Sequence, residues 1–333
     1  MEVLMLTRTE LGSLSVSNMA FGAMYLGTKT NHGTSMALLD TYLAAGGNFI
    51  DTADNYTFWV DGGKSGDSER LIGEWLANRG GRDKLVIATK VGARPTEEGA
   101  FLDKAEGLSY EAIILAAEMS LENLGTDYID LYYAHVDDRT VPIEETLRAF
   151  DHLVRAGKVR EIACSNYTAW RVEQARATSA AHGFASYVAI QHRHSFFKPA
   201  QGIKLGLADA LGERGGHGVE NVVGSELIDY VEAHPGFRIV AYSPLLQGGV
   251  ADPNRLAKNY LTADNNKRRT VLEEIVAETG ATANQIVLAW MMATRSAVIP
   301  LVAASKLNQL EENLKASKVI LTAEQLDKLN EAA

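Results

Sequence analysis

The chain has 333 residues, with 32 Lys and Arg against 42 Asp and Glu, which gives a formal net charge of −10. The cations are scattered rather than clustered, which argues against a nucleic-acid partner. A single cysteine, Cys164, excludes an intrachain disulfide framework. The N-terminus has no basic region followed by a long apolar run, and no stretch is long and apolar enough to span a membrane, so we expect a cytoplasmic protein without a membrane partner.

The first predicted element is a hairpin, and a regular alternation of strands and helices follows it. Residues 4–17 hold two alternating runs with residues 10–13, Glu-Leu-Gly-Ser, between them, which predicts a β-hairpin. A short apolar, β-branched run followed by a segment of helical period then recurs eight times. Strands are predicted over residues 18–22, 48–52, 85–90, 128–136, 159–165, 187–191, 237–243 and 297–302. Helices are predicted to begin near Ser35, Ser68, Ser109, Ile143, Thr168, Val222, Thr270 and Lys306.

Two of these helices carry signals at their ends. Ser109 precedes an apolar-periodic run that stops before Gly125, a residue that readily adopts the left-handed conformation of a helix C-terminus. Thr322 is followed by Gln325, the pattern of a capping box, which predicts a last helix at the C-terminus.

The organisation favours one closed barrel. No Pro- or Ser-rich linker and no block of like charge interrupts the chain, so we interpret residues 1–333 as a single domain. Eight β/α units favour an α/β fold of the (β/α)8 TIM-barrel type over an open sheet. The segments 192–219 and 245–266 exceed ordinary loop length, and long loops in a compact domain are usually functional.

Several familiar motifs are not met. No Gly-x-Gly-x-x-Gly follows a predicted strand, which argues against a Rossmann site. Residues 63–65 resemble the end of a P-loop, but Phe58 stands where the first glycine belongs. His192 and His194 have the spacing that places two imidazoles on one face of a strand, yet no third ligand is evident nearby, so we expect no metal.

Four polar residues fall at or near the ends of three consecutive predicted strands. Asp51, Lys90 and His135 lie at these ends, and Tyr56 lies in the loop after Asp51. Each residue alone has an ordinary structural explanation. Together they predict a catalytic site, because barrel enzymes place their catalytic groups at the carboxyl ends of the strands.

Longer segments of the chain resemble the aldo-keto reductase family. They are GNFIDTADNY (47–56), GDSERLIG (66–73), TKVG (89–92), TDYIDLYYAH (126–135), GKVREIACSN (157–166), AYSPL (241–245) and QLEENL (309–314). These segments occur in the family's order and span nearly the whole chain. The resemblance implies a TIM barrel that reduces carbonyl compounds with a nicotinamide cofactor, NADP (NADPH), through a tetrad matched by Asp51, Tyr56, Lys90 and His135.

The chemistry of the reaction suits these residue types. Hydride arriving at a carbonyl carbon leaves charge on the oxygen, which needs a proton donor. We expect Tyr56 to be that donor and Lys90 to acidify it; moving a phenol from about 10 to about 7 requires roughly 4 kcal/mol. Asp51 would hold Lys90 charged and in place, and His135 would orient the carbonyl.

The resemblance also implies a set of cofactor-binding residues. Those that match the nicotinamide site are Ser165, Asn166, Gln191 and, for stacking on the ring, Tyr242. Those that match the loop over the pyrophosphate are Ser243, Pro244, Leu245 and Gly248. Those that match the adenosine half are Ser305, Lys306, Gln309, Glu312 and Asn313. A lysine at a helix start suits a phosphate.

Two departures from the family pattern bear on specificity. Residues 57–66 are longer than the family's usual link, so the pocket wall beside Tyr56 is unusual. Gln309 stands where some relatives carry an arginine for the 2′-phosphate, so a preference for NADP rests on Ser305 and Lys306.

The substrate is expected to be a small carbonyl compound, in a pocket lined by Met24, Tyr25, Phe58 and Trp59. The particular aldehyde or ketone, the direction of the reaction and the oligomeric state stay open. One alternative is a regulatory protein similar to the β subunits of potassium channels, which share the fold and the tetrad. Another is a barrel aldolase in which Lys90 forms a Schiff base.

Overall fold

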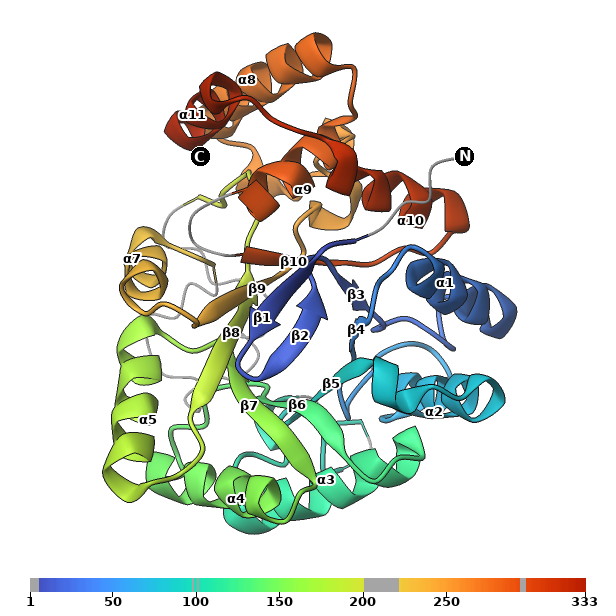
Figure 1. Ribbon diagram of the computed structural model, residues 1–333, viewed down its shortest axis with the longest axis vertical. Coiled ribbons are helices and arrows are strands. Elements are labelled where there is room, and N and C mark those ends of the chain that lie inside the picture. The colour runs from blue at the N-terminus through green and yellow to red at the C-terminus, as the bar shows by residue number, and fades with distance from the viewer. Residues whose placement is uncertain (1–5, 98, 101, 201–221, 294–297) are drawn as a thin grey trace.

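The computed structural model describes residues 6–97, 99–100, 102–200, 222–293 and 298–333. The barrel strands are β3 (Ala20–Gly22), β4 (Phe49–Asp51), β5 (Val86–Val91), β6 (Ile129–Ala134), β7 (Val159–Ser165), β8 (Tyr187–Arg193), β9 (Arg238–Tyr242) and β10 (Val298–Val302). They pair in parallel and close in chain order, with β10 beside β3 (Figure 1). The eight predicted strands are confirmed, and the fold is a (β/α)8 TIM barrel.

The barrel is filled by one face of every strand. Successive side chains of a strand point to opposite sides, so alternate residues line the interior. The apolar interior set is Ala20, Phe49, Val86, Ala88, Leu131, Tyr133, Ala163, Ala189, Val240 and Ile299. Residues between them, such as Ile50, Ile87 and Tyr132, pack beneath the helices. Burial on both faces explains the continuous apolar runs in the sequence.

Helices cover the outside of the barrel (Figure 1). They are α1 (His32–Ala44), α2 (Asp67–Arg79), α3 (Tyr110–Leu124), α4 (Ile143–Arg155), α5 (Ala169–His182), α7 (Ser225–Ala233), α8 (Ala263–Thr279), α9 (Ala283–Ala293), α10 (Leu307–Leu314) and α11 (Ala323–Ala332).

The predicted helix start near Thr270 is wrong, because α8 begins at Ala263. Thr262 caps this helix by accepting a hydrogen bond from the Asn265 backbone N–H. Its first two turns are polar, so the apolar period that guided the prediction sets in later.

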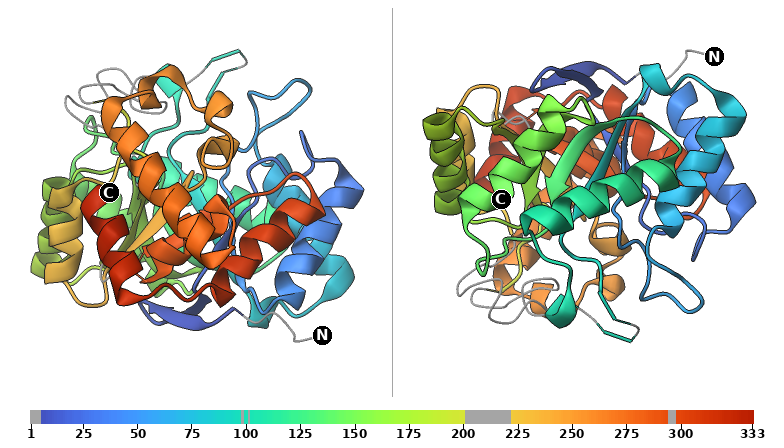
Figure 2. Two further views of the ribbon diagram at one scale, coloured as in Figure 1. Left: turned by 90° about the horizontal axis from the view of Figure 1, so that it is seen from above. Right: turned by 90° about the horizontal axis from the view of Figure 1, so that it is seen from below.

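The N-terminal hairpin is confirmed as β1 (Arg8–Leu11) and β2 (Leu14–Ser17). Residues 4 and 5 of the predicted range lie outside the described residues. Figure 2 shows the hairpin across the end of the barrel opposite the loops that follow the strands. At its turn, Gly12 has φ +59°, and a Cβ there would lie 2.7 Å from the Glu161 Cδ atom and 2.9 Å from Val188 Cγ1. The turn requires glycine because it presses against the barrel end.

The two long loops differ from their predicted bounds. The first begins after Arg193, because β8 continues two residues beyond Gln191, and the rest of the predicted loop, from residue 201 on, lies outside the described residues. The second ends at Thr262 and contains three short 3-10 turns, at Leu246–Gly248, Pro253–Arg255 and Lys258–Tyr260.

Capping is observed at both helices where it was predicted. Ser109 accepts from the Ala112 backbone N–H at the start of α3, and Gly125 ends that helix with φ 60°. Thr322 and Gln325 form a reciprocal capping box at the start of α11. Among the described residues, no helix is long and apolar enough to cross a membrane.

Candidate active site

Three neighbouring strands bring the four predicted catalytic residues to one mouth of the barrel. Asp51 is the last residue of β4, Lys90 is the penultimate residue of β5, and His135 directly follows β6. Tyr56 lies in the loop after β4. Because parallel strands end on the same side of the barrel, these side chains meet at its carboxyl end.

A buried ion pair forms the base of this site. The Lys90 Nζ atom donates to Asp51 Oδ1 at 2.5 Å and to the Thr52 carbonyl at 2.6 Å, and both charged side chains are almost completely excluded from solvent. Gln191 donates from Nε2 to the other Asp51 oxygen at 2.7 Å. Burial raises the pKa of Asp51 while Lys90 opposes the rise, and burial lowers the pKa of Lys90 while Asp51 opposes the fall. Each partner therefore favours the charged form of the other.

Tyr56 is placed above the ion pair but is not acidified by it. Its hydroxyl lies 3.5 Å from Lys90 Nζ, at the limit of a hydrogen bond. Burial raises the pKa of Tyr56 well above its ordinary value, and the carboxylates of Asp51 and Asp54 raise it further. The expected acidification is not found, because Lys90 gives its short contacts to Asp51 and Thr52 and its charge is balanced there. The phenol is therefore neutral.

His135 is a neutral imidazole beside the phenol. Burial lowers its pKa well below the ordinary value, and the charge of Lys90 lowers it further. Its ring stands edge-on to the Tyr56 ring, with 5.8 Å between centroids. Its Nδ1 atom is buried and has no hydrogen-bond partner among the described residues. One ring nitrogen of a neutral imidazole carries a proton that can be donated to a carbonyl oxygen.

Behind Tyr56 lies a buried acid pair that sequence reasoning missed. Both carboxyl oxygens of Asp54 are buried and accept no hydrogen bond from a described donor, and the nearest cation is Arg94 Nε at 3.9 Å. Arg94 is bound instead to Glu106, at 2.8 Å from Nη2 to Oε2. Burial raises the pKa of Asp54 well above its ordinary value, and the neighbouring Glu106 raises it further. The ionised form of Asp54 is therefore disfavoured in the folded state. Nothing in the sequence pairs residues 54 and 106.

The residues expected at the nicotinamide are also brought together. The Tyr242 hydroxyl donates to Asn166 Oδ1 at 3.0 Å, and Asn166 Nδ2 donates to Ser165 Oγ and to the His135 carbonyl, each at 3.0 Å. This chain of contacts joins the ends of β7 and β9 to the tetrad. Gln191 differs from the expectation in one respect, because its amide nitrogen is already engaged by Asp51.

The loop after β9 has an unusual backbone. Ser243, Leu246 and Gln247 have φ between 48° and 55°, and Gly248 has φ 96°. A Cβ at Gly248 would lie 2.7 Å from the Arg255 guanidinium. The carbonyl of Pro244 accepts from Ser195 Oγ at 2.7 Å, and Leu245 packs against the core. A tight left-handed turn of this kind lets backbone approach a ligand closely, which fits the expected pyrophosphate loop.

The residues expected at the adenosine half gather at the start of α10. Lys306 is the exposed N-cap residue and offers no side-chain cap, so the first N–H groups of the helix are open to a ligand. Gln309 Oε1 accepts from both the backbone N–H and the hydroxyl of Ser305, each at 3.1 Å. Glu312 accepts from Thr282 at 2.8 Å, and Asn313 is buried. The donor set of hydroxyl, amide, ammonium and helix N-terminus fits a phosphorylated nucleoside.

The expected substrate pocket lies beside Tyr56. The Trp59 ring stands edge-on to Tyr56, 5.8 Å between centroids, and edge-on to Phe58, 5.1 Å between centroids. Trp59 is nevertheless 38% exposed, so part of its ring faces solvent. Tyr25, which follows β3, lies near enough to Tyr56 to influence its pKa, and Met24 beside it is half-buried.

Two other features are set apart from this site. His192 and His194 are buried, burial lowers their pKa values to about 3 and about 4, and His194 packs on Trp290. The described residues contain no group of three side chains suited to a metal.

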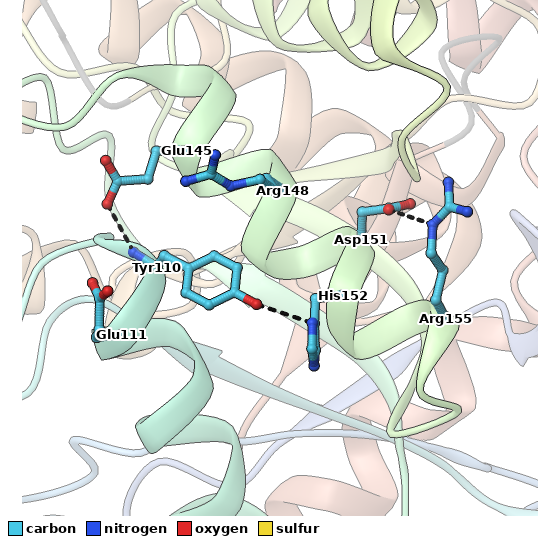
Figure 3. Close-up of a pocket in the computed structure, with 7 residues that line it drawn as sticks. All are labelled: Tyr110, Glu111, Glu145, Arg148, Asp151, His152 and Arg155. Carbon is cyan, nitrogen blue, oxygen red and sulfur yellow. Dashed lines mark hydrogen bonds and ion pairs between the residues drawn. The ribbon is translucent and has the colours of Figure 1, made fainter.

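A surface groove between α3 and α4 lies outside the barrel. Within it, Tyr110 and His152 point toward one another, and the Tyr110 hydroxyl is hydrogen-bonded to His152 Nδ1 at 2.9 Å (Figure 3). None of the predicted site residues lines this groove.

Comparison with known proteins gives the family. The sequence pattern of the aldo/keto reductase family matches residues 18–333. Norsolorinic acid reductase of Aspergillus flavus is 29% identical over 96% of this chain and 77% of its own length. The uncharacterized oxidoreductase YrpG of Bacillus subtilis is 31% identical over 99% of this chain and 95% of its own length. Aryl-alcohol dehydrogenase (NADP+) of Phanerodontia chrysosporium is 29% identical over 96% of this chain and 83% of its own length.

A solved structure agrees with these sequence relatives. The crystal structure of the thermostable aldo-keto reductase Tm1743 with the inhibitor epalrestat superposes with a TM-score of 0.71 and 28% identity, covering 98% of this chain and 100% of that one. Since the family pattern covers nearly the whole chain and the barrel is shared, the chain belongs to the aldo/keto reductase family.

Proposed function

We propose that this protein is an NADP(H)-dependent reductase of an aldehyde or ketone, with Tyr56 as the proton donor. The observation that carries the proposal is the convergence of the Tyr56 hydroxyl, the Lys90 ammonium and the His135 imidazole at the mouth that also holds Ser165, Asn166 and Tyr242. A reduced nicotinamide, when bound, supplies hydride to a carbonyl carbon. The chain's own residues then handle the charge and the proton.

The charge that develops on the carbonyl oxygen is met by two donors. His135, neutral because it is buried, donates an N–H to the oxygen and orients the carbonyl. Tyr56 gives up its proton to the same oxygen as the alkoxide forms. The high pKa of the Tyr56 phenol still allows this, because an alkoxide is the stronger base.

Lys90 acts by position and charge rather than as a nucleophile. Its ammonium is 3.5 Å from the Tyr56 oxygen, so it stabilises the phenolate that is left after proton transfer. Asp51 and the Thr52 carbonyl keep Lys90 charged and fixed. A Schiff-base lysine must be neutral with a free lone pair, so this ion pair disfavours the aldolase alternative.

We infer the preference for NADP(H) from Ser305 and Lys306. Lys306 is exposed at the N-terminus of α10, where a cation and the helix N–H groups together suit the extra phosphate. The neighbouring Gln309 is neutral, and its carbonyl is already bound to Ser305. The Phanerodontia relative is an NADP+ enzyme by name, which supports the same preference.

The test is the Tyr56→Phe variant, assayed with NADPH and a panel of aldehydes and ketones. We expect kcat to fall by several orders of magnitude while NADPH binding, followed by quenching of tryptophan fluorescence, is retained. A Tyr56→Phe enzyme that turns over a good substrate at nearly the wild-type rate would exclude Tyr56 as the donor.

A channel-subunit role makes a different prediction. A regulatory protein of that kind would co-purify with a membrane protein and bind NADPH without appreciable steady-state turnover. Turnover of a simple aldehyde by the wild-type chain therefore decides between the two.

A further inference from the structure

Arg193 is a charged residue at the barrel mouth that the tetrad and the expected cofactor contacts leave unused. It is the last residue of β8 and lies two residues after Gln191, so both side chains face the mouth. Its Cα pairs with Tyr242 across the strands, and its guanidinium carbon lies over the Tyr242 ring, 5.2 Å from the centroid. Arg193 thus stands against the ring on which the nicotinamide is expected to stack.

The charge of Arg193 has no carboxylate partner in the part of the chain that the structure describes. Its Nε atom is buried without a hydrogen-bond partner. The groups near its guanidinium are the phenols of Tyr242 and Tyr260, whose pKa values it lowers against the effect of burial. A half-buried cation between two neutral rings keeps donors available for an anion.

Other arginines around the barrel contrast with Arg193. Arg82 binds Asp130 at 2.7 Å, Arg94 binds Glu106 at 2.8 Å, and Arg171 binds Asp137 at 2.9 Å. Each places its guanidinium on a buried carboxylate of the protein, as burial of a charge requires. Among the described residues Arg193 has no such carboxylate, which leaves its charge available to an anion that enters the mouth.

We propose that Arg193 binds an anionic group of a ligand at the mouth, either a phosphate of the dinucleotide or a carboxylate carried by the carbonyl substrate. This inference rests on the proposed function, because it places the anion beside Tyr242 and Tyr56. A planar guanidinium suits both groups, since phosphate and carboxylate each accept two parallel N–H donors. The cation–π contact with Tyr242 holds the guanidinium in place for that contact.

The test compares Arg193→Gln and Arg193→Lys with the wild type, and uses Arg139→Gln as a matched control. Arg139 lies in the loop after β6, and its guanidinium also lies over an aromatic ring, 5.1 Å from the Trp170 centroid, but it is paired with Asp137 at 2.8 Å. One measurement is the Kd of NADPH and of NADH by fluorescence quenching. The other is the ratio of kcat/KM for 4-carboxybenzaldehyde to that for its methyl ester.

A phosphate contact predicts that Arg193→Gln weakens NADPH and NADH alike by about tenfold or more, with the substrate ratio unchanged. A carboxylate contact predicts that the ratio falls by about tenfold or more, with both Kd values unchanged. In either case Arg193→Lys recovers part of the loss and Arg139→Gln has neither effect. If Arg193→Gln changes neither quantity, or changes only the melting temperature, the proposal is wrong.

The two proposals fail in different ways. If the wild-type chain reduces no carbonyl compound, the proposed function fails, but the Kd measurements still decide whether Arg193 holds a phosphate. Suppose instead that the wild-type chain reduces 4-carboxybenzaldehyde and its methyl ester. If the Arg193 variants then match the wild type in the Kd values and in the kcat/KM ratio, only the Arg193 inference fails.

Discussion

The buried carboxyl of Asp54 gives the sharpest test of the electrostatics beside Tyr56. Its two oxygens have no described donor, and the nearest cation, Arg94, is 3.9 Å away and bound to Glu106. Burial and the neighbouring Glu106 raise the pKa of this carboxyl, so the folded state favours its protonated form. Asp54→Asn replaces the neutral acid by a neutral group of the same shape that can still donate to Glu106.

The expected effect is a change in how stability depends on pH. In the unfolded chain Asp54 loses its proton near pH 4, whereas in the folded chain its pKa is raised well above that value. Between these two pKa values the folded state binds one more proton than the unfolded state. Wild-type stability therefore falls, through this group, by about 1.4 kcal/mol for each unit that the pH rises. Asp54→Asn removes that loss.

The assay is urea unfolding of wild type and Asp54→Asn at several pH values from 4.5 upward. The free energy of unfolding of the asparagine variant, relative to that of the wild type, should rise by about 1.4 kcal/mol per pH unit until the folded-state pKa of Asp54 is reached. A difference that is flat with pH, or that moves toward the wild type, refutes the protonated acid. Asp130→Asn is the control, because Asp130 is bound to Arg82 and Arg160, and its loss should destabilise the protein by several kcal/mol.

Two further substitutions test the ligand sites. Lys306→Ala should weaken the binding of NADPH by about tenfold or more and leave the binding of NADH nearly unchanged, because the ammonium would face only the extra phosphate. Fluorescence titration measures both affinities. An equal loss of affinity for both cofactors would mean that Lys306 is a solvated surface cation and does not contact that phosphate. Trp59→Ala should raise KM for bulky aromatic aldehydes and leave NADPH affinity and melting temperature nearly unchanged, because the ring lies against Tyr56 yet is 38% exposed. A fall in stability with unchanged relative kcat/KM across a substrate series would instead make the Trp59 loop structural.

The strand ends could be predicted from the sequence because each is marked locally. An apolar run followed by Asp51, Lys90 or His135 fixes the end of a strand, and parallel pairing then brings the three together without further information. The start of α8 could not be found in this way, because its first turns are polar and apolar periodicity begins only near Leu272. The cap formed by Thr262 and Asn265 is a signal that was present in the sequence.

The electrostatics of the site could not be predicted, since they depend on contacts between distant segments. The sequence suggested that Lys90 lowers the pKa of Tyr56, but burial and two carboxylates raise it. The proximity of Asp54 to Glu106 and of Arg193 to Tyr260 is likewise set by loops whose course no periodicity describes. Residue types at strand ends predict which groups meet, and burial decides their protonation.

The hairpin at the far end of the barrel has a consequence for turnover. Leu11, Leu14 and Val16 belong to the same buried cluster as the interior residues of the barrel, such as Leu131. In the part of the chain that the structure describes, these side chains therefore fill the barrel beneath the tetrad. Under the proposed function, substrate entry, product exit and the return of a proton to Tyr56 all use the mouth, so a ligand that stays there delays all three.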